Sequence, residues 1–210
     1  MRIALIHALR HSPPPVEAAF ARLWPQATLM NLLDDSLSAD LVRDGALTPA
    51  MFDRFLTLAS YAVDTGVAGI LFTCSAFGPC IERCADAFPA IPVLKPNEAM
   101  IAEAVRLGGR AALLASFPGT LDTMPAEFPA GFELRPVLVE GALAALDRGD
   151  GAEHDRLTAA TAAGLPADRD LILLGQFSLA RAAPAVAAAT GKRGLCTPDS
   201  AVALLKERLG

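Results

Sequence analysis

The residue of this sequence whose type and position are best suited to chemistry is Cys74. It ends the apolar run that begins at Gly69, and the small residues Ser75 and Ala76 follow it. Small residues let the backbone turn sharply and direct N–H groups into a cleft. A helix that begins soon after a strand-end thiol favours the thiolate and lowers the pKa from about 8.5. We therefore predict a reactive thiol at Cys74; the alternative is a small apolar residue of the core.

The sequence nearly repeats itself, and the repeat sets Gln176 opposite Cys74. Residues 69–74 align with 171–176, residues 96–99 align with 198–201 at the same offset, and a looser match sets residues 3–6 against 111–114. Two similar halves predict two equivalent strand ends that face one cleft, with a thiol on one side and an amide on the other. An amide both donates and accepts hydrogen bonds, so Gln176 would hold a carboxylate or a carbonyl. The alternative is that Gln176 completes a local hydrogen-bond network.

Hydroxyl groups follow other predicted strands. Ligands of open parallel sheets bind beyond the carboxyl ends of the strands. This rule selects Ser12 in the first loop, Ser116 and Thr120 after the fifth strand, and Ser178 two residues after Gln176. The loop of Ser116 and Thr120 suits anion capture, and it suits equally a turn that caps a helix.

The three histidines are interpreted mainly as structural or solvent-exposed residues. His7 is expected at a strand end, and His11 is expected in a solvated loop, with assistance to proton transfer as the alternative. His154 is expected on the exposed face of a helix.

Strands and helices alternate along the chain, which predicts parallel sheets covered by helices. The fold class is therefore α/β, with two pseudo-symmetric parallel-sheet halves and the active site in the cleft between them. The predicted first half comprises residues 1–95 and 197–210, and the second comprises residues 96–196. Short apolar runs predict strands at 2–7, 27–33, 67–73, 91–94, 111–115, 134–139, 170–174 and 193–196. Helices are predicted near 16–23, 49–65, 79–87, 97–107, 121–126, 141–147, 152–163, 179–190 and 199–209.

Composition excludes several classes of partner. The chain has 210 residues, of which 53% are hydrophobic, so it can bury a sizeable core. A net charge of −5 without a Lys/Arg cluster argues against nucleic acid. No apolar run approaches the roughly 18 residues of a membrane helix, and the N-terminus is unlike a signal peptide. We therefore expect a cytoplasmic protein with no membrane partner.

The motifs resemble the Asp/Glu/hydantoin racemase superfamily, which includes amino-acid racemases, maleate isomerase and arylmalonate decarboxylase. The resemblance covers essentially the whole chain. It rests on four segments: the first loop ending in Ser12, residues 71–75, residues 173–176, and the helix after Pro198-Asp199. It implies that Cys74 is the first-half catalytic cysteine and that Ser75 and Ser12 bind the carboxylate. Ser116 and Thr120 would help to hold that carboxylate from the second half.

The sequence departs from the racemase pattern at Gln176, where a racemase has its second cysteine. The resemblance still implies a racemase or isomerase that acts on a small carboxylate or related carbonyl compound through Cys74. One alternative is a lyase similar to arylmalonate decarboxylase. The other is a carboxylate-binding protein that lost the second cysteine and with it catalysis.

The resemblance implies no metal and no organic cofactor, and no phosphate-binding loop or dinucleotide fingerprint is present in the sequence. The expected partner is a small-molecule carboxylate, and a homodimer is the assembly that many proteins of this fold adopt. Cys80 and Cys84 lie one helical turn apart without a following histidine, which favours buried helix cysteines over a zinc site.

Overall fold

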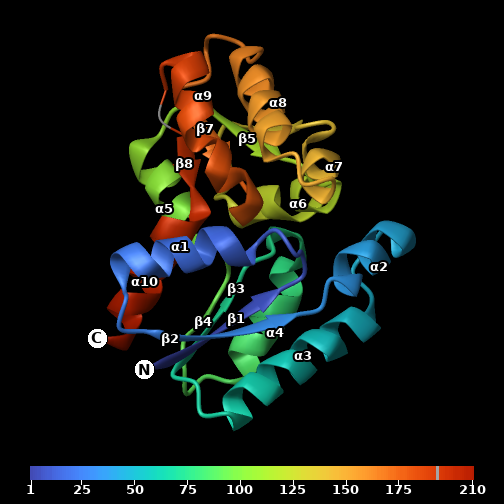
Figure 1. The fold of residues 1–210 in the computed structure, drawn as a ribbon, viewed down its shortest axis with the longest axis vertical. Helices are drawn as coiled ribbons and strands as arrows, with labels where there is room; N and C mark the ends of the chain where they lie inside the picture. The colour runs from blue at the N-terminus through green and yellow to red at the C-terminus, as the bar shows by residue number, and fades with distance from the viewer. Residues whose placement is uncertain (193) are drawn as a thin grey trace.

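The computed structural model describes residues 1–192 and 194–210, and within them the strands form two parallel four-stranded sheets. The first sheet has the order β2-β1-β3-β4 and the second β6-β5-β7-β8. The strands are β1 (Arg2–His7), β2 (Thr28–Leu33), β3 (Gly69–Phe72), β4 (Val93–Leu94), β5 (Ala111–Ala115), β6 (Leu134–Leu138), β7 (Leu171–Leu174) and β8 (Gly194–Cys196). Figure 1 shows the second sheet with its helices above the first. The predicted α/β class is confirmed.

The two sheets have matching topology and register. In the first, Ile3 of β1 pairs with Gly69 of β3, and in the second, Ala111 of β5 pairs with Leu171 of β7. Strands β3 and β7 therefore occupy the same place in their sheets, as the repeat predicts. Their carboxyl ends carry Cys74 and Gln176.

Helices cover both faces of each sheet. The helices are α1 (Pro13–Leu23), α2 (Ser36–Asp44), α3 (Pro49–Asp64), α4 (Gly78–Ala87), α5 (Glu98–Leu107), α6 (Pro118–Thr123), α7 (Ala142–Asp147), α8 (Gly151–Ala163), α9 (Ala183–Thr190) and α10 (Thr197–Leu209). Short 3₁₀ helices are η1 (Ser75–Phe77), η2 (Met124–Glu127) and η3 (Phe177–Ala182). Helices α3 and α4 pack on one face of the first sheet, and α1 and α10 pack on the other.

Helix α10 links the two halves of the sequence. It follows β8 of the second sheet, yet its apolar residues Ala201, Val202 and Leu205 pack with Ile3 and Leu71 of the first. Helix α5 takes the equivalent place on the second sheet, with Met100, Ile101 and Ala104 in the core beside Leu113 and Leu173.

Two features differ from the sequence-based expectations. No helix is predicted between residues 33 and 49, whereas Ser36–Asp44 form α2, which buries Leu37, Ser38 and Leu41 and ends at Gly45. Gly45 has a φ of 70°, a left-handed conformation that suits the residue after a helix. His154 was expected to be exposed, but it lies on the inward face of α8 and is fully buried.

The remaining element boundaries agree with the sequence to within a few residues. The helix predicted near 121–126 is divided into α6 and η2, and that near 179–190 is divided into η3 and α9. Residue 193, predicted to begin β8, lies outside the described residues. In the part of the chain that the structure describes, none of the helices has the length and apolar character needed to span a bilayer.

Candidate active site between the two sheets

Cys74 lies where the sequence places it, two residues beyond the end of β3, but its thiol is not activated as predicted. Its residue is only 5% exposed, and burial raises the pKa of the thiol to about 11. Hydrogen bonds from the Ala76 backbone and the Ser38 side chain lower that pKa by less than burial raises it. The expectation of a lowered pKa is therefore wrong, because removal from water outweighs the field of the following turns. Cys74 is a protonated thiol at neutral pH.

Ser75 joins the two halves of the molecule. Its hydroxyl donates to the carbonyl of Gly175 at 2.9 Å, so the 3.1 Å contact with Thr120 Oγ1 has Thr120 as the donor. Thr123 Oγ1 in turn donates to the Ser75 carbonyl at 3.1 Å. Both hydroxyl protons predicted to bind a carboxylate are therefore engaged between the halves in this structure.

The Gln176 side chain accepts hydrogen bonds from donors of the second half. Its side-chain oxygen accepts the Ser116 N–H at 2.5 Å, the Ser116 hydroxyl at 3.1 Å and the Phe117 N–H at 3.2 Å. All these groups are buried. The alternative given for Gln176, a local hydrogen-bond network, is what the structure shows. Ser116 was predicted to hold an anion, and here it holds the Gln176 amide oxygen instead.

The other two predicted residues lie apart from this network. Ser12 is buried before α1, and its backbone N–H donates to the Leu9 carbonyl at 3.2 Å. Ser178 is buried in η3, and its hydroxyl has no hydrogen-bond partner among the described residues. Ser178 lies in the wall of a cavity that Ser12 and Cys74 do not line.

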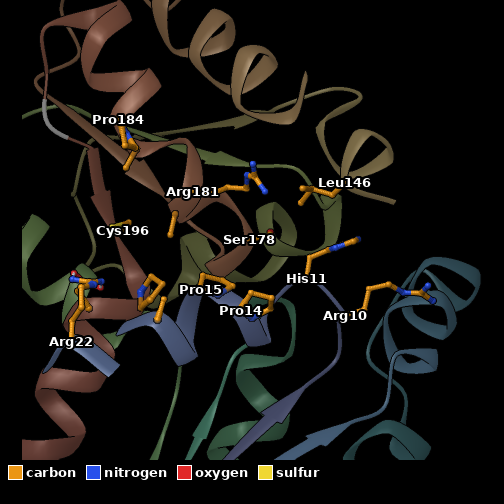
Figure 2. A pocket seen from close by; sticks show the side chains of 15 residues that line it. Arg10, His11, Pro14, Pro15, Arg22, Leu146, Ser178, Arg181, Pro184 and Cys196 are labelled. Carbon is orange, nitrogen blue, oxygen red and sulfur yellow. Dashed lines mark hydrogen bonds and ion pairs between the residues drawn. The ribbon is translucent and has the colours of Figure 1, made fainter. Parts of the chain in front are cut away.

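That cavity has a volume of about 560 Å³ and lies between α1 on one side and η3 with the start of α9 on the other (Figure 2). Its lining residues come from the loop before α1, from α1, α7, η3 and α9, and from the junction of β8 with α10. The sequence does not single out Arg181, which falls inside the helix predicted near 179–190. A single arginine so soon after a strand-end residue was the available signal.

His11 also lines this cavity, and its side chain is 17% exposed. Its Nε2 lies 2.8 Å from Asp147 of α7, so the histidine connects the first loop to the second half. The expectation of a solvated histidine is therefore only partly right.

A chain of hydrogen bonds leads from the surface to the residue before Cys74. Asn31 Nδ2 donates to the Glu17 carboxylate at 2.8 Å, which fixes Asn31 Oδ1 as an acceptor for His7 Nε2–H at 2.9 Å. His7 Nδ1 then accepts the Thr73 hydroxyl at 2.7 Å. Burial lowers the pKa of His7 despite the raising effect of the Asn31 bond and the Glu17 charge, which agrees with this neutral form. His7 ends β1 as predicted.

The thiols and acids do not gather into a metal centre. Within residues 1–192 and 194–210, no group of three or more His, Cys, Asp or Glu side chains is placed to hold an ion. Cys80 and Cys84 are fully buried on α4, as the sequence indicates.

Solved structures share this architecture. A glutamate racemase from Francisella tularensis superposes with a TM-score of 0.78 at 13% identity, over 98% of this chain and 80% of that one. Allantoin racemase from Klebsiella pneumoniae superposes with a TM-score of 0.74 at 16% identity, over 99% of this chain and 86% of that one. The fold is that of these racemases.

A mutant of arylmalonate decarboxylase has the same fold, with a TM-score of 0.63 at 20% identity over 100% of this chain and 94% of that chain. No family model matches the sequence, and no curated protein matches it. At these identities the likeness establishes the arrangement of strands and helices. Any reaction that the protein catalyses depends on the residues at the strand ends.

Proposed function

We propose that this protein is a cofactor-independent enzyme of the racemase or isomerase type. Its substrate would be a small carboxylate or a related carbonyl compound, and Cys74 would move a proton at the carbon beside that group. The observation that carries the proposal is the place of Cys74. It follows β3 next to Ser75, which is bonded to Gly175 and Thr120 of the second half. The thiol therefore lies where the two halves meet, beyond the carboxyl ends of parallel strands.

In this proposal the arrangement with Ser75 bonded to Gly175 and Thr120 is closed, and the halves separate to admit a substrate. The bonds of Ser75 to Gly175 and Thr120 would break, and the freed hydroxyls would donate to the carboxylate. Cys74, protonated while it is buried, first releases its proton to the water that enters as the halves separate. The resulting thiolate accepts the proton from carbon, and the electron pair left on carbon spreads into the neighbouring carbonyl. The thiol returns a proton to the same carbon to complete the exchange.

The amide at Gln176 gives this proposal a stereochemical consequence. An amide neither gives nor takes a proton at neutral pH, so Gln176 cannot act on the face opposite Cys74. Proton exchange on the Cys74 face is therefore expected to be faster than inversion. A Gln176→Cys variant supplies the missing thiol and is expected to gain inversion.

The raised pKa of Cys74 favours a lyase as the second candidate. Because burial keeps the Cys74 thiol protonated, the resting enzyme carries a proton donor. A malonate that loses CO₂ leaves an electron pair on carbon, which a thiol can protonate directly. The arylmalonate decarboxylase fold match is consistent with this reaction.

The test is incubation in D₂O with a panel of amino acids, hydantoins, malonates and other small carboxylates, followed by proton NMR. Loss of the α-proton signal without loss of optical activity supports one-sided exchange, and a decarboxylated product supports the lyase. Either activity must disappear in Cys74→Ala and persist in the matched control Cys80→Ala. Full activity in Cys74→Ala would refute the role of the thiol. Binding without any turnover would identify a carboxylate-binding protein instead.

A further inference from the structure

We propose that the cavity between α1 and the segment 177–184 is a binding site for a small carboxylate that carries an apolar body. Its volume of about 560 Å³ falls within the range of about 300–1,000 Å³ that is usual for small-molecule sites. Cys74 is not among the lining residues, so this site is separate from the chemistry proposed for that thiol.

A buried polar atom in the wall points to a missing ligand. The Ser178 hydroxyl is shielded from water and has no hydrogen-bond partner among the described residues. A buried hydroxyl without a partner costs free energy, and a ligand acceptor that displaces the wall atoms covering the hydroxyl would recover that cost. Ser178 sits near the centre of the view in Figure 2, between Arg181 and the two prolines of α1.

The charges of the lining favour an anion. Four basic side chains line the cavity, and Asp199 is the one acidic side chain among its lining residues. Arg10, His11 and Arg181 pair with Asp35, Asp147 and Asp155, all of which lie outside the lining. Arg22 pairs with Asp199 within the lining, so the lining residues include more basic than acidic side chains.

Arg181 is the best placed of these groups to hold a carboxylate. It donates to Asp155 through Nε at 2.9 Å and Nη2 at 3.2 Å, and its Nη1 takes part in no hydrogen bond within the described residues. The guanidinium lies over Gly151 so closely that a Cβ there would overlap it. Gly151 thus permits the position of Arg181, whose orientation is fixed by Asp155 from the other side. A fixed guanidinium with unused N–H groups is suited to a carboxylate.

The rest of the wall is apolar and would cover the body of the ligand. It is formed by Pro14, Pro15, Ala18, Leu146, Ala180 and Pro184. Prolines and alanines lose little conformational freedom on contact with a ligand. An aryl or branched alkyl group beside the carboxylate matches this wall, whereas a small polar amino acid would leave it exposed to water.

Cys196 provides a built-in reporter of occupancy. It lies at the other end of the cavity, at the start of α10, and it is the partly exposed cysteine of the chain. A bound ligand that covers this end slows alkylation of the thiol. Iodoacetamide is uncharged, so its reaction reports access to Cys196 and not attraction by the arginines.

The probe is phenylacetate. Phenylacetamide is the control without the negative charge, and acetate is the control without the apolar group. Calorimetry measures binding, and peptide mass spectrometry measures the alkylation rate of Cys196. Phenylacetate at ten times its dissociation constant should slow alkylation about tenfold. Phenylacetamide should bind roughly tenfold more weakly or worse, because it lacks the charge. Acetate should give no protection.

Paired variants on one helix locate the site. Ala18→Trp fills the cavity from the exposed face of α1 and should abolish binding of phenylacetate, whereas Ala21→Trp on the same helix lies outside the lining and should leave binding unchanged. Arg181→Gln should reduce the affinity for phenylacetate to that which the parent protein has for phenylacetamide. Cys74→Ala should bind phenylacetate like the parent protein, which separates this proposal from the proposed catalysis.

Three outcomes would overturn the proposal. Equal binding of phenylacetate and phenylacetamide would remove the role of charge. Unchanged binding in Ala18→Trp would place the ligand elsewhere. Absence of binding by phenylacetate in the parent protein would remove the site.

Discussion

The side-chain oxygen of Gln176 lies 2.5 Å from the backbone nitrogen of Ser116 and fills the position at which three donors converge. Two backbone N–H groups and a hydroxyl directed at one point form the kind of arrangement that stabilises an oxyanion. In this chain the point is taken by an amide of the same half. Gln176 therefore occupies these donors itself, and its amide offers no group that exchanges a proton at neutral pH at this strand end.

Gln176→Ala is expected to destabilise the protein. Removing the shared acceptor leaves buried donors unsatisfied, which costs about 2–4 kcal/mol in total. Urea unfolding measures the loss. Gln176→Glu is the control, because its carboxylate accepts the same bonds and should retain more stability at neutral pH. Equal stability of Gln176→Ala and the parent protein would contradict the network.

Ser75→Ala is expected to loosen the contact between the two halves. The variant loses the bond to the Gly175 carbonyl and the acceptor for Thr120, which costs about 1–2 kcal/mol. Cys74 should then react faster with iodoacetamide, as measured by peptide mass spectrometry. Ser200→Ala is the matched control on α10, because the Ser200 hydroxyl makes no hydrogen bond within the described residues. An unchanged rate at Cys74 in Ser75→Ala would show that this bond does not restrict access.

Iodoacetamide is expected to modify Cys196 before the other three cysteines. Burial raises the pKa of Cys74 to about 11 and those of Cys80 and Cys84 to about 12, and all three are buried. Few of these thiols are ionised near neutral pH, and the thiolate is the reactive form. Timed alkylation followed by peptide mass spectrometry gives the order. Earlier modification of Cys74 would indicate that the halves open readily in solution.

Stability is expected to fall as the solution is acidified below about pH 6.5. Burial is the main cause that lowers the pKa values of His7 and His154, so both are neutral in the folded protein. In the unfolded chain they take up protons near the ordinary value of 6.5. Their contribution is complete above that value and is lost as the pH falls through the lower folded-state values.

Urea unfolding at about pH 8 and pH 5 tests this dependence. A double variant, His7→Gln with His154→Gln, should be less stable than the parent at the higher pH and should show a shallower decline. A decline of the same size in the double variant would assign the acid sensitivity to carboxylates.

The sequence alone predicted the parts of the fold that local pattern controls. Apolar runs located the strands, and the internal repeat placed Cys74 and Gln176 at equivalent strand ends. Helix α2 was missed because its buried face carries only Leu37 and Leu41 as large apolar residues, with Ser38 between them. His154 was misplaced for a similar reason, since its neighbours Glu153 and Asp155 are charged while the histidine itself faces inward.

The sequence located the candidate site, but it could not predict the hydrogen bonds between the residues of that site. Ser75 and Thr120 are 45 residues apart, and Ser75 and Gly175 are 100 residues apart. Local pattern marks each residue as the start of a turn or helix. Only the packing of one half against the other shows that their hydroxyls are engaged with each other. The pKa of Cys74 depends in the same way on α2, whose position the sequence did not reveal. Leu37 and Leu41 belong to the core cluster that buries the thiol, whereas Ser38 lowers its pKa.

The placement of α10 has a consequence for biosynthesis. The apolar face of Ile3, Leu5 and Leu71 is covered in part by Ala201, Val202 and Leu205. A ribosome makes the strands of the first sheet long before it makes α10, so that face stays incompletely covered while the whole second sheet is being synthesised. The first half of the nascent chain therefore exposes apolar surface from the synthesis of β4 (Val93–Leu94) until that of α10 (Thr197–Leu209). During that interval a chaperone that binds unfolded chains has the most apolar surface to bind.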